Sequence, residues 1–441
     1  MSVVSSLYTG VTGLQTLGSA MQVIGNNISN INTIGYKASR AEFSDLLSQN
    51  LTGSALGSQI GRGVKLAQVT GLFTQGSFQT TGRVTDLAIS GNGFFIVNDG
   101  SANFYTRAGQ FNLNSDGQLV NVGNLRVQGY VFDANGVNTG VLGDINLSNL
   151  TAAPQATETV SVSANLDASE VPPNQPAGFD ITNPAGTSNF STSLTVFDSL
   201  GNSRVLTVYF EKSADATIPD FVADRSWKWH AVVDGGEVAG GTAGTPTEIF
   251  SGTMTFNPDG SLRTLTQAAG SVDFANGAAP GQTIAFNFGT PTGVAGTGGT
   301  GLDGMTQFAG PEVVNFQSQD GFGPGQLQAI DINQDGIVTG VFSNGEARAV
   351  AQIALANFQN QQGLFRIGDN LFQETNYSGL PTVGAPNTGA FGSVVSSSLE
   401  LSNVDLTAEF VSMITNQRGF QANSRVITVG DEMLESVVNL T

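Results

Sequence analysis

Hydrophobic residues recur with helical spacing near both ends of the chain and with a different spacing in the middle. Near the N-terminus, apolar side chains repeat every seven residues, and two further rows run beside the first. The first row comprises Leu7, Leu14, Met21 and Ile28, and Val11 stands in the second. A repeat of this kind predicts an amphipathic helix with a broad apolar face over residues 1–31.

A second set of heptad positions occupies the C-terminal region. Its main row contains Leu406, Met413, Phe420, Ile427 and Leu434, and Phe410 lies beside it. Residues 402–405 offer N-cap side chains, with Asp405 at the positive end of the helix dipole, so a helix start near Asn403 is expected. The carboxylates predicted to mark the polar face of this helix are Glu409, Asp431, Glu432 and Glu435.

Two broad apolar faces need a covering that a single helix does not provide. Each exposed Leu, Ile or Phe forgoes roughly 1.5–3 kcal/mol of burial free energy. The helices must therefore pack against each other, against further copies of the chain, or both. From the pattern alone, packing within one chain is the more common outcome.

The middle of the chain has the pattern of β-structure. From residue 72 onward, apolar runs bounded by turn residues, with recurring Asp-Gly pairs, predict β-hairpins. Residues 147–307 contain several prolines and a tract rich in Gly, Thr and Ala at 289–304. This stretch is predicted to be an inserted domain with loose connections.

Composition excludes several classes of function. The chain has 441 residues, a formal charge of −19, one histidine and no cysteine. The acidic balance argues against binding nucleic acid or anionic lipid, and the lack of cysteine removes disulfides, thiol catalysis and cysteine-based metal sites. No charge precedes Lys37 and no apolar run is long enough to span a membrane, so neither a Sec signal nor membrane insertion is expected.

Three motifs superficially resemble chemical sites. Residues 331–336 open like a calcium loop, but Phe342 stands where the loop needs a glutamate, so a hairpin is favoured. Residues 296–301 fit a nucleotide-binding glycine pattern, but no helix follows, so a linker is favoured. His230 lies in a strand-like run without catalytic companions. No catalytic, cofactor or metal site is therefore expected, and the chain is not expected to be an enzyme.

Motifs at both ends resemble those of the bacterial flagellar rod and hook proteins. The N-terminal run that ends at Tyr36 and Lys37 is similar to the N-terminal signature of that family and contains Asn26, Asn27, Asn30 and Gly35. The C-terminal run is similar to the other signature and contains Asn403, Asp405, Gln417, Arg418, Gln421 and Asn423. Residues 147–307 resemble an insert found in the hook members, whereas distal rod members are much shorter.

The resemblance implies a structural subunit that polymerises with itself into a curved tube. Such a tube acts as a universal joint that transmits torque from rod to filament. It also implies export through the flagellar type III apparatus without a cleavable signal peptide, an extracellular location in the flagellum, and contacts with rod proteins, the hook cap and the hook–filament junction protein. A distal rod or other axial protein is the alternative, and a secreted acidic β-rich adhesin is less favoured because it does not explain the terminal heptads.

The expected fold is mixed. The terminal helices form a coiled-coil-like inner layer, and two mainly β domains follow, the outer one inserted into the inner one. The expected parts are a terminal helical domain (1–36 with 403–441), extended connecting segments (37–71 with 369–402), an inner β domain (72–146 with 308–368) and an outer β domain (147–307). The apolar heptad residues are expected to pack between subunits, with hinges at Gly71, 151–154 and 296–304. A cysteine–lysine cross-link, thought to join subunits in some hook proteins, is excluded here.

Overall fold

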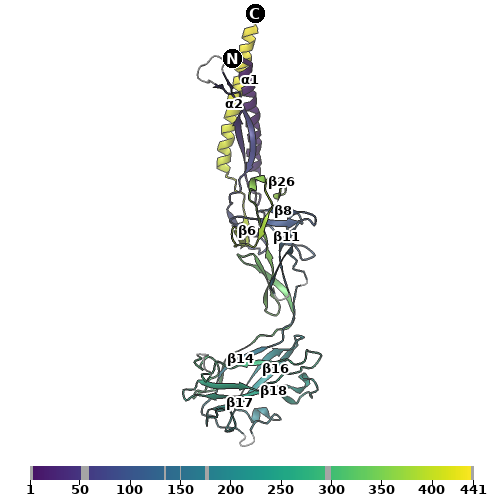
Figure 1. Ribbon diagram of the computed structural model, residues 1–441, viewed down its shortest axis with the longest axis vertical. Coiled ribbons are helices and arrows are strands. Elements are labelled where there is room, and N and C mark those ends of the chain that lie inside the picture. The colour runs from purple at the N-terminus through teal and green to yellow at the C-terminus, as the bar shows by residue number, and fades with distance from the viewer. Residues whose placement is uncertain are drawn as a thin grey trace. The chain divides into compact units, whose positions relative to one another are not determined.

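The chain divides into two compact units. The computed structural model describes residues 3–50, 59–133, 136–148, 150–173, 178–293 and 299–438. Unit 1 comprises Met1–Asn149, Gln328–Val341 and Ala347–Thr441, and unit 2 comprises Leu150–Leu327 and Phe342–Glu346. The expected helix at each end and the β-rich middle are confirmed (Figure 1).

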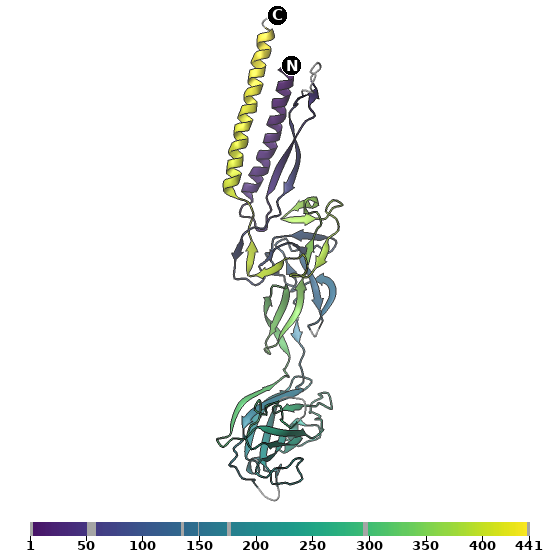
Figure 2. The same ribbon diagram turned by 60° about the vertical axis from the view of Figure 1, so that its left-hand side comes forward.

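The two helices of unit 1 come from opposite ends of the sequence. Helix α1 spans Val3–Ser29 and α2 spans Leu406–Val438, and the two lie side by side (Figure 2). The start of α2 falls after the expected Asn403, because Asp405 provides the cap. Its Oδ1 accepts hydrogen bonds from the backbone N–H groups of Thr407 at 2.8 Å and Ala408 at 3.1 Å, which satisfies donors that a helix start leaves free.

An antiparallel ladder runs along α1. Strand β1 (Ser39–Asp45) pairs with β4 (Val64–Gly71), and β2 (Gln49–Asn50) pairs with β3 (Gln59–Ile60). The ladder approaches α1 closely at Gly63, where a Cβ atom would lie 2.2 Å from Thr12 Oγ1 and φ is +110°. Gly71, expected to be a hinge, is held by Gln362, which accepts from its N–H at 3.1 Å and donates to its carbonyl at 2.7 Å.

The remainder of unit 1 is a β body. Its strands are β5 (Phe78–Thr80), β6 (Leu87–Ser90), β7 (Phe94–Asn98), β8 (Asn103–Thr106), β9 (Asn112–Leu113), β10 (Leu119–Val120), β11 (Arg126–Phe132), β12 (Asn138–Asp144), β23 (Ile337–Phe342), β24 (Ala347–Ile353), β25 (Leu355–Asn357), β26 (Phe365–Gly368), β27 (Leu371–Gln373), β28 (Thr382–Gly384), β29 (Ser393–Ser396) and β30 (Ser398–Glu400). Strand β29 pairs with β6, and β30 pairs with β5. The segment that leads into α2 is therefore joined to the segment that follows β4.

Unit 2 is built on an antiparallel sheet with the order β15-β16-β17-β18-β19. A second sheet has the order β20-β14-β21. The strands are β13 (Thr151–Ala152), β14 (Thr159–Asn165), β15 (Phe190–Phe197), β16 (Ser203–Lys212), β17 (Ser226–Asp234), β18 (Pro246–Phe256), β19 (Leu262–Gln267), β20 (Ala285–Asn287) and β21 (Val313–Gln319). Alternating side chains of these strands enclose one core, in which Trp227 and Trp229 are fully buried.

The motifs that superficially resembled chemical sites are structural where they are described. Strands β22 (Gly325–Ile332) and β23 form the predicted hairpin, and Asn333 Oδ1 accepts from the backbone N–H groups of Asp335 and Ile337 at 3.0 Å. His230 lies on β17 and stacks on Phe179 with 4.0 Å between ring centroids. Part of the glycine tract, 294–298, lies outside the described residues. Over the described ranges, no group of three acidic, His or Cys residues fits a metal, and no helix is long and apolar enough to cross a membrane.

Candidate functional site

The contact between α1 and α2 depends on small residues of α1. The buried residues of α1 are Gly10, Gly13, Thr16, Ala20, Ile24 and Asn27. A Cβ atom on Gly10 would lie 3.1 Å from Ile427 Cγ1, and one on Gly13 would lie 2.7 Å from Asn423 Nδ2. A side chain at either position would require Ile427 or Asn423 to shift. The two glycines therefore favour the close approach of α2, despite their cost in helix propensity.

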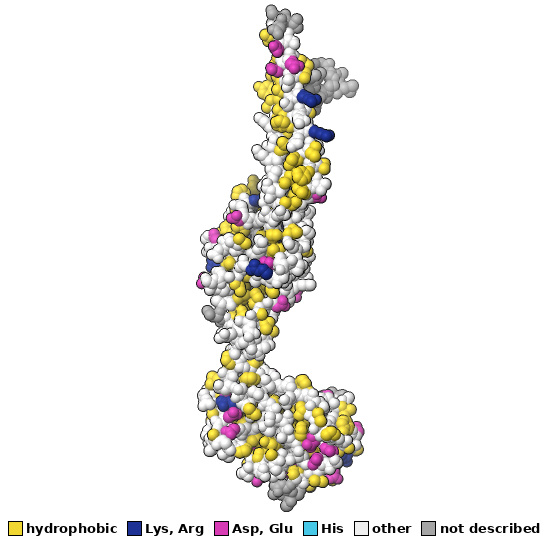
Figure 3. All heavy atoms as spheres, turned by 180° about the vertical axis from the view of Figure 1, so that it is seen from behind, with side chains coloured by type: hydrophobic (Ala, Val, Ile, Leu, Met, Phe, Trp, Pro, Cys, Tyr) yellow, Lys and Arg dark blue, Asp and Glu magenta, His cyan; other side chains and the backbone are white. Residues whose placement is uncertain are grey.

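The predicted heptad residues are only partly covered within the chain. Leu7, Leu14, Met21, Ile28, Met413, Ile427 and Leu434 are half-buried, while Val11, Leu406, Phe410 and Phe420 are exposed. Further exposed apolar residues of α2 are Val411, Ile414, Val426, Val429 and Met433. Hydrophobic side chains accordingly gather along the helical part of the face shown in Figure 3. The helix pair leaves much of its apolar surface without partners in the single chain.

Asn27 connects three elements at the base of the helix pair. Its Nδ2 donates to the carbonyl of Ser39 on β1 at 2.7 Å and to Glu409 Oε1 on α2 at 2.8 Å. Its Oδ1 accepts from the N–H of Ser39 at 2.9 Å. Glu409 was expected on the polar face of α2, and this expectation is wrong: its carboxylate turns toward α1 because Asn27 offers it a buried donor. Asp431, Glu432 and Glu435 are exposed as expected.

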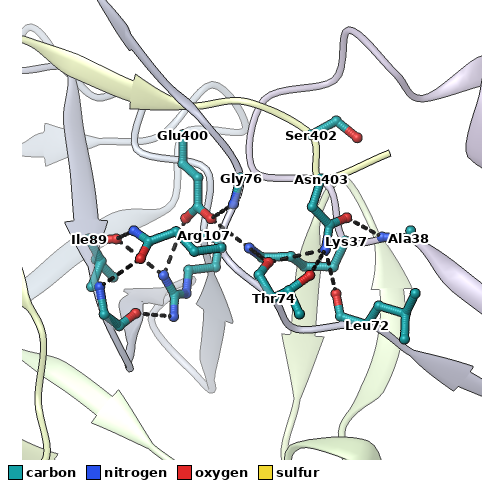
Figure 4. Close-up of polar contacts among 12 residues, drawn as sticks. Lys37, Ala38, Leu72, Thr74, Gly76, Ile89, Arg107, Glu400, Ser402 and Asn403 are labelled. Atoms are coloured by element: carbon teal, nitrogen blue, oxygen red, sulfur yellow. Dashed lines mark hydrogen bonds and ion pairs between the residues drawn. The ribbon is translucent and has the colours of Figure 1, made fainter. Parts of the chain in front are cut away.

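Asn403 plays a similar part just before α2. Its Oδ1 accepts from the N–H of Ala38 at 2.8 Å, and its Nδ2 donates to the carbonyl of Leu72 at 2.7 Å and to Thr74 Oγ1 at 2.9 Å (Figure 4). A single carboxamide thereby links the end of the N-terminal segment, the end of β4 and the start of α2. The segment that follows α1 and the segment that precedes α2 are thus held together.

A buried ionic cluster lies beside Asn403. Glu400 Oε1 is 2.6 Å from Lys37 Nζ, and Glu400 Oε2 is 3.2 Å from Arg107 Nη1. The side chains of Lys37 and Glu400 are fully buried, and that of Arg107 is 4% exposed. Lys37 also donates to the carbonyl of Thr74 at 2.7 Å, and Gly76 N–H donates to Glu400 Oε1 at 2.8 Å (Figure 4). Burial lowers the pKa of Lys37, and the negative charge of Glu400 opposes that shift.

Several other signature residues have structural roles within the chain. Gly35 has φ +70°, and a Cβ atom there would lie 2.5 Å from the N atom of Ala108, so only glycine fits. Asn26 Nδ2 donates to the hydroxyl of Tyr36 at 3.3 Å, and Asn30 Nδ2 donates to the carbonyl of Asn26 at 2.9 Å. Asn423 fills the space left by Gly13. The signature thus encodes the end of α1 and the helix contact.

Three signature residues have no such role. Gln417, Arg418 and Gln421 are exposed on α2, and their side chains form no hydrogen bond or ion pair with any part of the chain that the structure describes. The cluster of Lys37, Arg107 and Glu400 was not predicted from the sequence. The available signal was that Lys37 and Arg107 are isolated charges within otherwise uncharged motifs.

Four family models match the chain, and all describe axial proteins of the flagellum. They are "Flagella basal body rod protein" over residues 7–37, "Flagellar hook protein FlgE/F/G D1 domain" over 88–166, "Flagellar basal body protein FlaE D2 domain" over 165–322 and "Flagellar basal body rod FlgEFG protein C-terminal" over 395–440. The class is therefore that of flagellar rod and hook subunits, which are structural proteins and not enzymes.

Full-length relatives define the family further. The flagellar hook protein FlgE of Borreliella burgdorferi is 35% identical, and that of Escherichia coli is 36% identical, with 99% and 98% of both chains covered, respectively. A crystal structure of the Helicobacter pylori flagellar hook protein FlgE2 covers 72% of this chain and 98% of its own, with a TM-score of 0.47 and 16% identity. The chain belongs to the flagellar hook protein family, and its function is that of a structural subunit of the hook.

Proposed function

We propose that this hook subunit polymerises through its terminal helices into a curved tube that acts as a universal joint between rod and filament. In this proposal, α1 and α2 form a coiled-coil-like inner layer around a channel. Unit 2 corresponds to the outer β domain that was predicted as an insertion at 147–307. The observation that carries the proposal is the apolar surface that α2 leaves exposed.

The exposed apolar residues of α2 are large. Val411 is 59% exposed, Val426 46% and Met433 52%. Complete burial of one such side chain contributes roughly 1.5–3 kcal/mol relative to full exposure, so covering the whole set by neighbouring copies supplies a substantial driving force. The uncharged stretch 1–36 supports the same conclusion, because burying it between copies removes no side-chain charge from water.

The proposed role in torque transmission rests on the polar contacts of Asn27, Asn403 and Glu400. Asn27 joins α1 to α2 and to β1, and Asn403 joins the start of α2 to the segments at residues 38 and 72–74. Glu400 on β30 then pairs Lys37 with Arg107 of the β body. We propose that these contacts carry torque from the helical layer to the β body. Exchangeable polar contacts between the outer β domains of neighbouring copies then permit bending.

We further propose that the chain reaches the cell exterior through the flagellar type III export apparatus. Rod proteins, the hook cap and the hook–filament junction protein are its proposed partners in the axis. The family membership supports these proposals. Proteomic analysis of isolated hook–basal bodies tests them: the chain should be found there at its full length, and its absence from them would contradict the proposed location.

The assembly proposal is tested by Val426→Asp, with Ser424→Asp as a matched control on the same helix. Val426 is exposed in the single chain, so the charge leaves folding intact but opposes burial between copies. The variants are expressed in cells that lack their own hook subunit, and electron microscopy counts the hooks. We expect no hooks with Val426→Asp and hooks with Ser424→Asp; normal hooks with Val426→Asp would contradict the proposal.

A further inference from the structure

Four residues along one side of α2 differ in charge. Val411, Arg418, Arg425 and Glu432 are spaced seven residues apart, and seven residues bring a helix back to almost the same side, with a drift of ~20°. All four side chains are exposed. We call these four residues the charged row. From the N-terminal end, it is apolar, then positive twice, then negative.

The charges of this row have no partner within the chain. Neighbours on a helix surface lie three or four residues apart, and no residue at those distances from Arg418, Arg425 or Glu432 has the opposite charge. Across the described residues, none of the three forms an ion pair. Helix α1 has no charged side chain to offer. The partners must therefore come from outside the chain or be absent.

We propose that the charged row sets the axial stagger between the α2 helices of neighbouring copies, with Glu432 of one copy paired with Arg418 of the next. This inference rests on the proposed polymer. Copies related by one repeated rotation and translation about the tube axis point the same way along it. Level neighbours would place Arg418 against Arg418 and Glu432 against Glu432, which is repulsive. A shift of two heptads, ~21 Å at 1.5 Å per residue, brings opposite charges together.

The choice of Arg418 rather than Arg425 follows from the signature residues. Asn27, Gly35, Asn403 and Asp405 all have roles within the chain. Arg418 belongs to the same signature and has none, so a role between copies accounts for its presence there. Arg425 stands outside the C-terminal motif that runs from Gln417 to Ser424.

Charge reversal tests the pairing in the full-length chain. Arg418→Glu and Glu432→Arg are made singly and together in cells that lack their own hook subunit. Each single variant should lose most of its hooks, because like charges then meet at the pair. The double variant should regain them. Because these residues lie fourteen apart on one helix, the rescue cannot arise within a single copy.

Three results would overturn the inference. Rescue of Glu432→Arg by Arg425→Glu instead of Arg418→Glu would assign a stagger of one heptad. Normal hooks with both single variants would show that the row does not set the stagger. Normal hooks with defective filament growth would place the row in the export channel. In all three cases the Val426→Asp experiment still tests the proposed function separately, because Val426 is not part of the charged row.

Discussion

The helix pair of unit 1 and the β sheets of unit 2 differ in how completely they bury their apolar side chains. In unit 2, Trp227, Trp229 and Phe288 are completely buried in one core that the sheets enclose. In the helix pair, the buried side of α1 is lined largely by glycine and polar residues, while Phe410, Val411 and Val429 of α2 remain exposed. Unit 2 completes its core within the chain, whereas the helix pair leaves large apolar side chains exposed in the single chain.

The largest effect should come from opening the core of unit 2. Trp229 packs against Phe286 at 4.8 Å and Phe288 at 5.2 Å between ring centroids. Trp229→Ala should lower the free energy of unfolding of unit 2 by ~3–5 kcal/mol. Chemical denaturation followed by the fluorescence of Trp227 measures this loss. If unit 2 and the helix pair fold independently, the helical circular dichroism signal at low denaturant stays unchanged. Loss of that signal would show that the helix pair needs the core of unit 2.

The next effect concerns the buried ionic cluster below the helices. Glu400→Gln leaves Lys37 and Arg107 buried without a countercharge, which should lower the free energy of unfolding of unit 1 by ~3 kcal/mol. Thermal unfolding measures the change. Glu42→Gln is the matched control, because its ion pair with Arg40 at 3.0 Å is exposed and should contribute nothing measurable. Equal losses of stability from the two substitutions would show that burial does not make the Glu400 cluster more important than the exposed ion pair.

Glycine substitutions in α1 separate the two sides of this helix. A Cβ atom on Gly13 would lie 2.7 Å from Asn423 Nδ2, but one on Gly25 would have nothing within 4 Å. Gly25→Ala should therefore stabilise the isolated chain by up to ~1 kcal/mol through helix propensity, and Gly13→Ala should destabilise the contact with α2. Thermal melts followed by circular dichroism give both values. A stabilising Gly13→Ala would contradict the close packing.

The smallest effect is a pH dependence within unit 2. Burial, together with the charges of Glu170 and Asp167, raises the pKa of Glu312 from its ordinary value of 4.5 to about 7. The folded state therefore holds this proton up to a higher pH than the unfolded state. Its contribution to stability is complete below pH 4.5 and is lost as the pH rises through 7. Glu312→Gln should flatten this part of the pH profile of the unfolding midpoint; an unchanged slope would rule out Glu312 as its source.

Local patterns predicted the elements but not all the contacts between them. The heptad rows correctly indicated both helices, and Asp405 lies at the start of α2 because capping is a local interaction. The predicted orientation of Glu409 was wrong, because its carboxylate accepts a hydrogen bond from Asn27, which lies 382 positions away in the sequence. The pairing of Lys37 with Glu400 spans 363 positions. A local periodicity does not predict contacts between residues so far apart in the sequence. These contacts form only when the N-terminal and C-terminal segments pack together.

We propose that neighbouring copies bury the exposed apolar surface of α2 in the hook. Because the chain has no cysteine, Val426→Cys provides a single thiol on that surface. The measurement is the rate of maleimide labelling in the dissociated subunit and in intact hooks, with hooks depolymerised after labelling as the reference for total thiol. We expect rapid labelling of the dissociated subunit and strong protection in the hook. Equal rates in the two states would contradict this proposal.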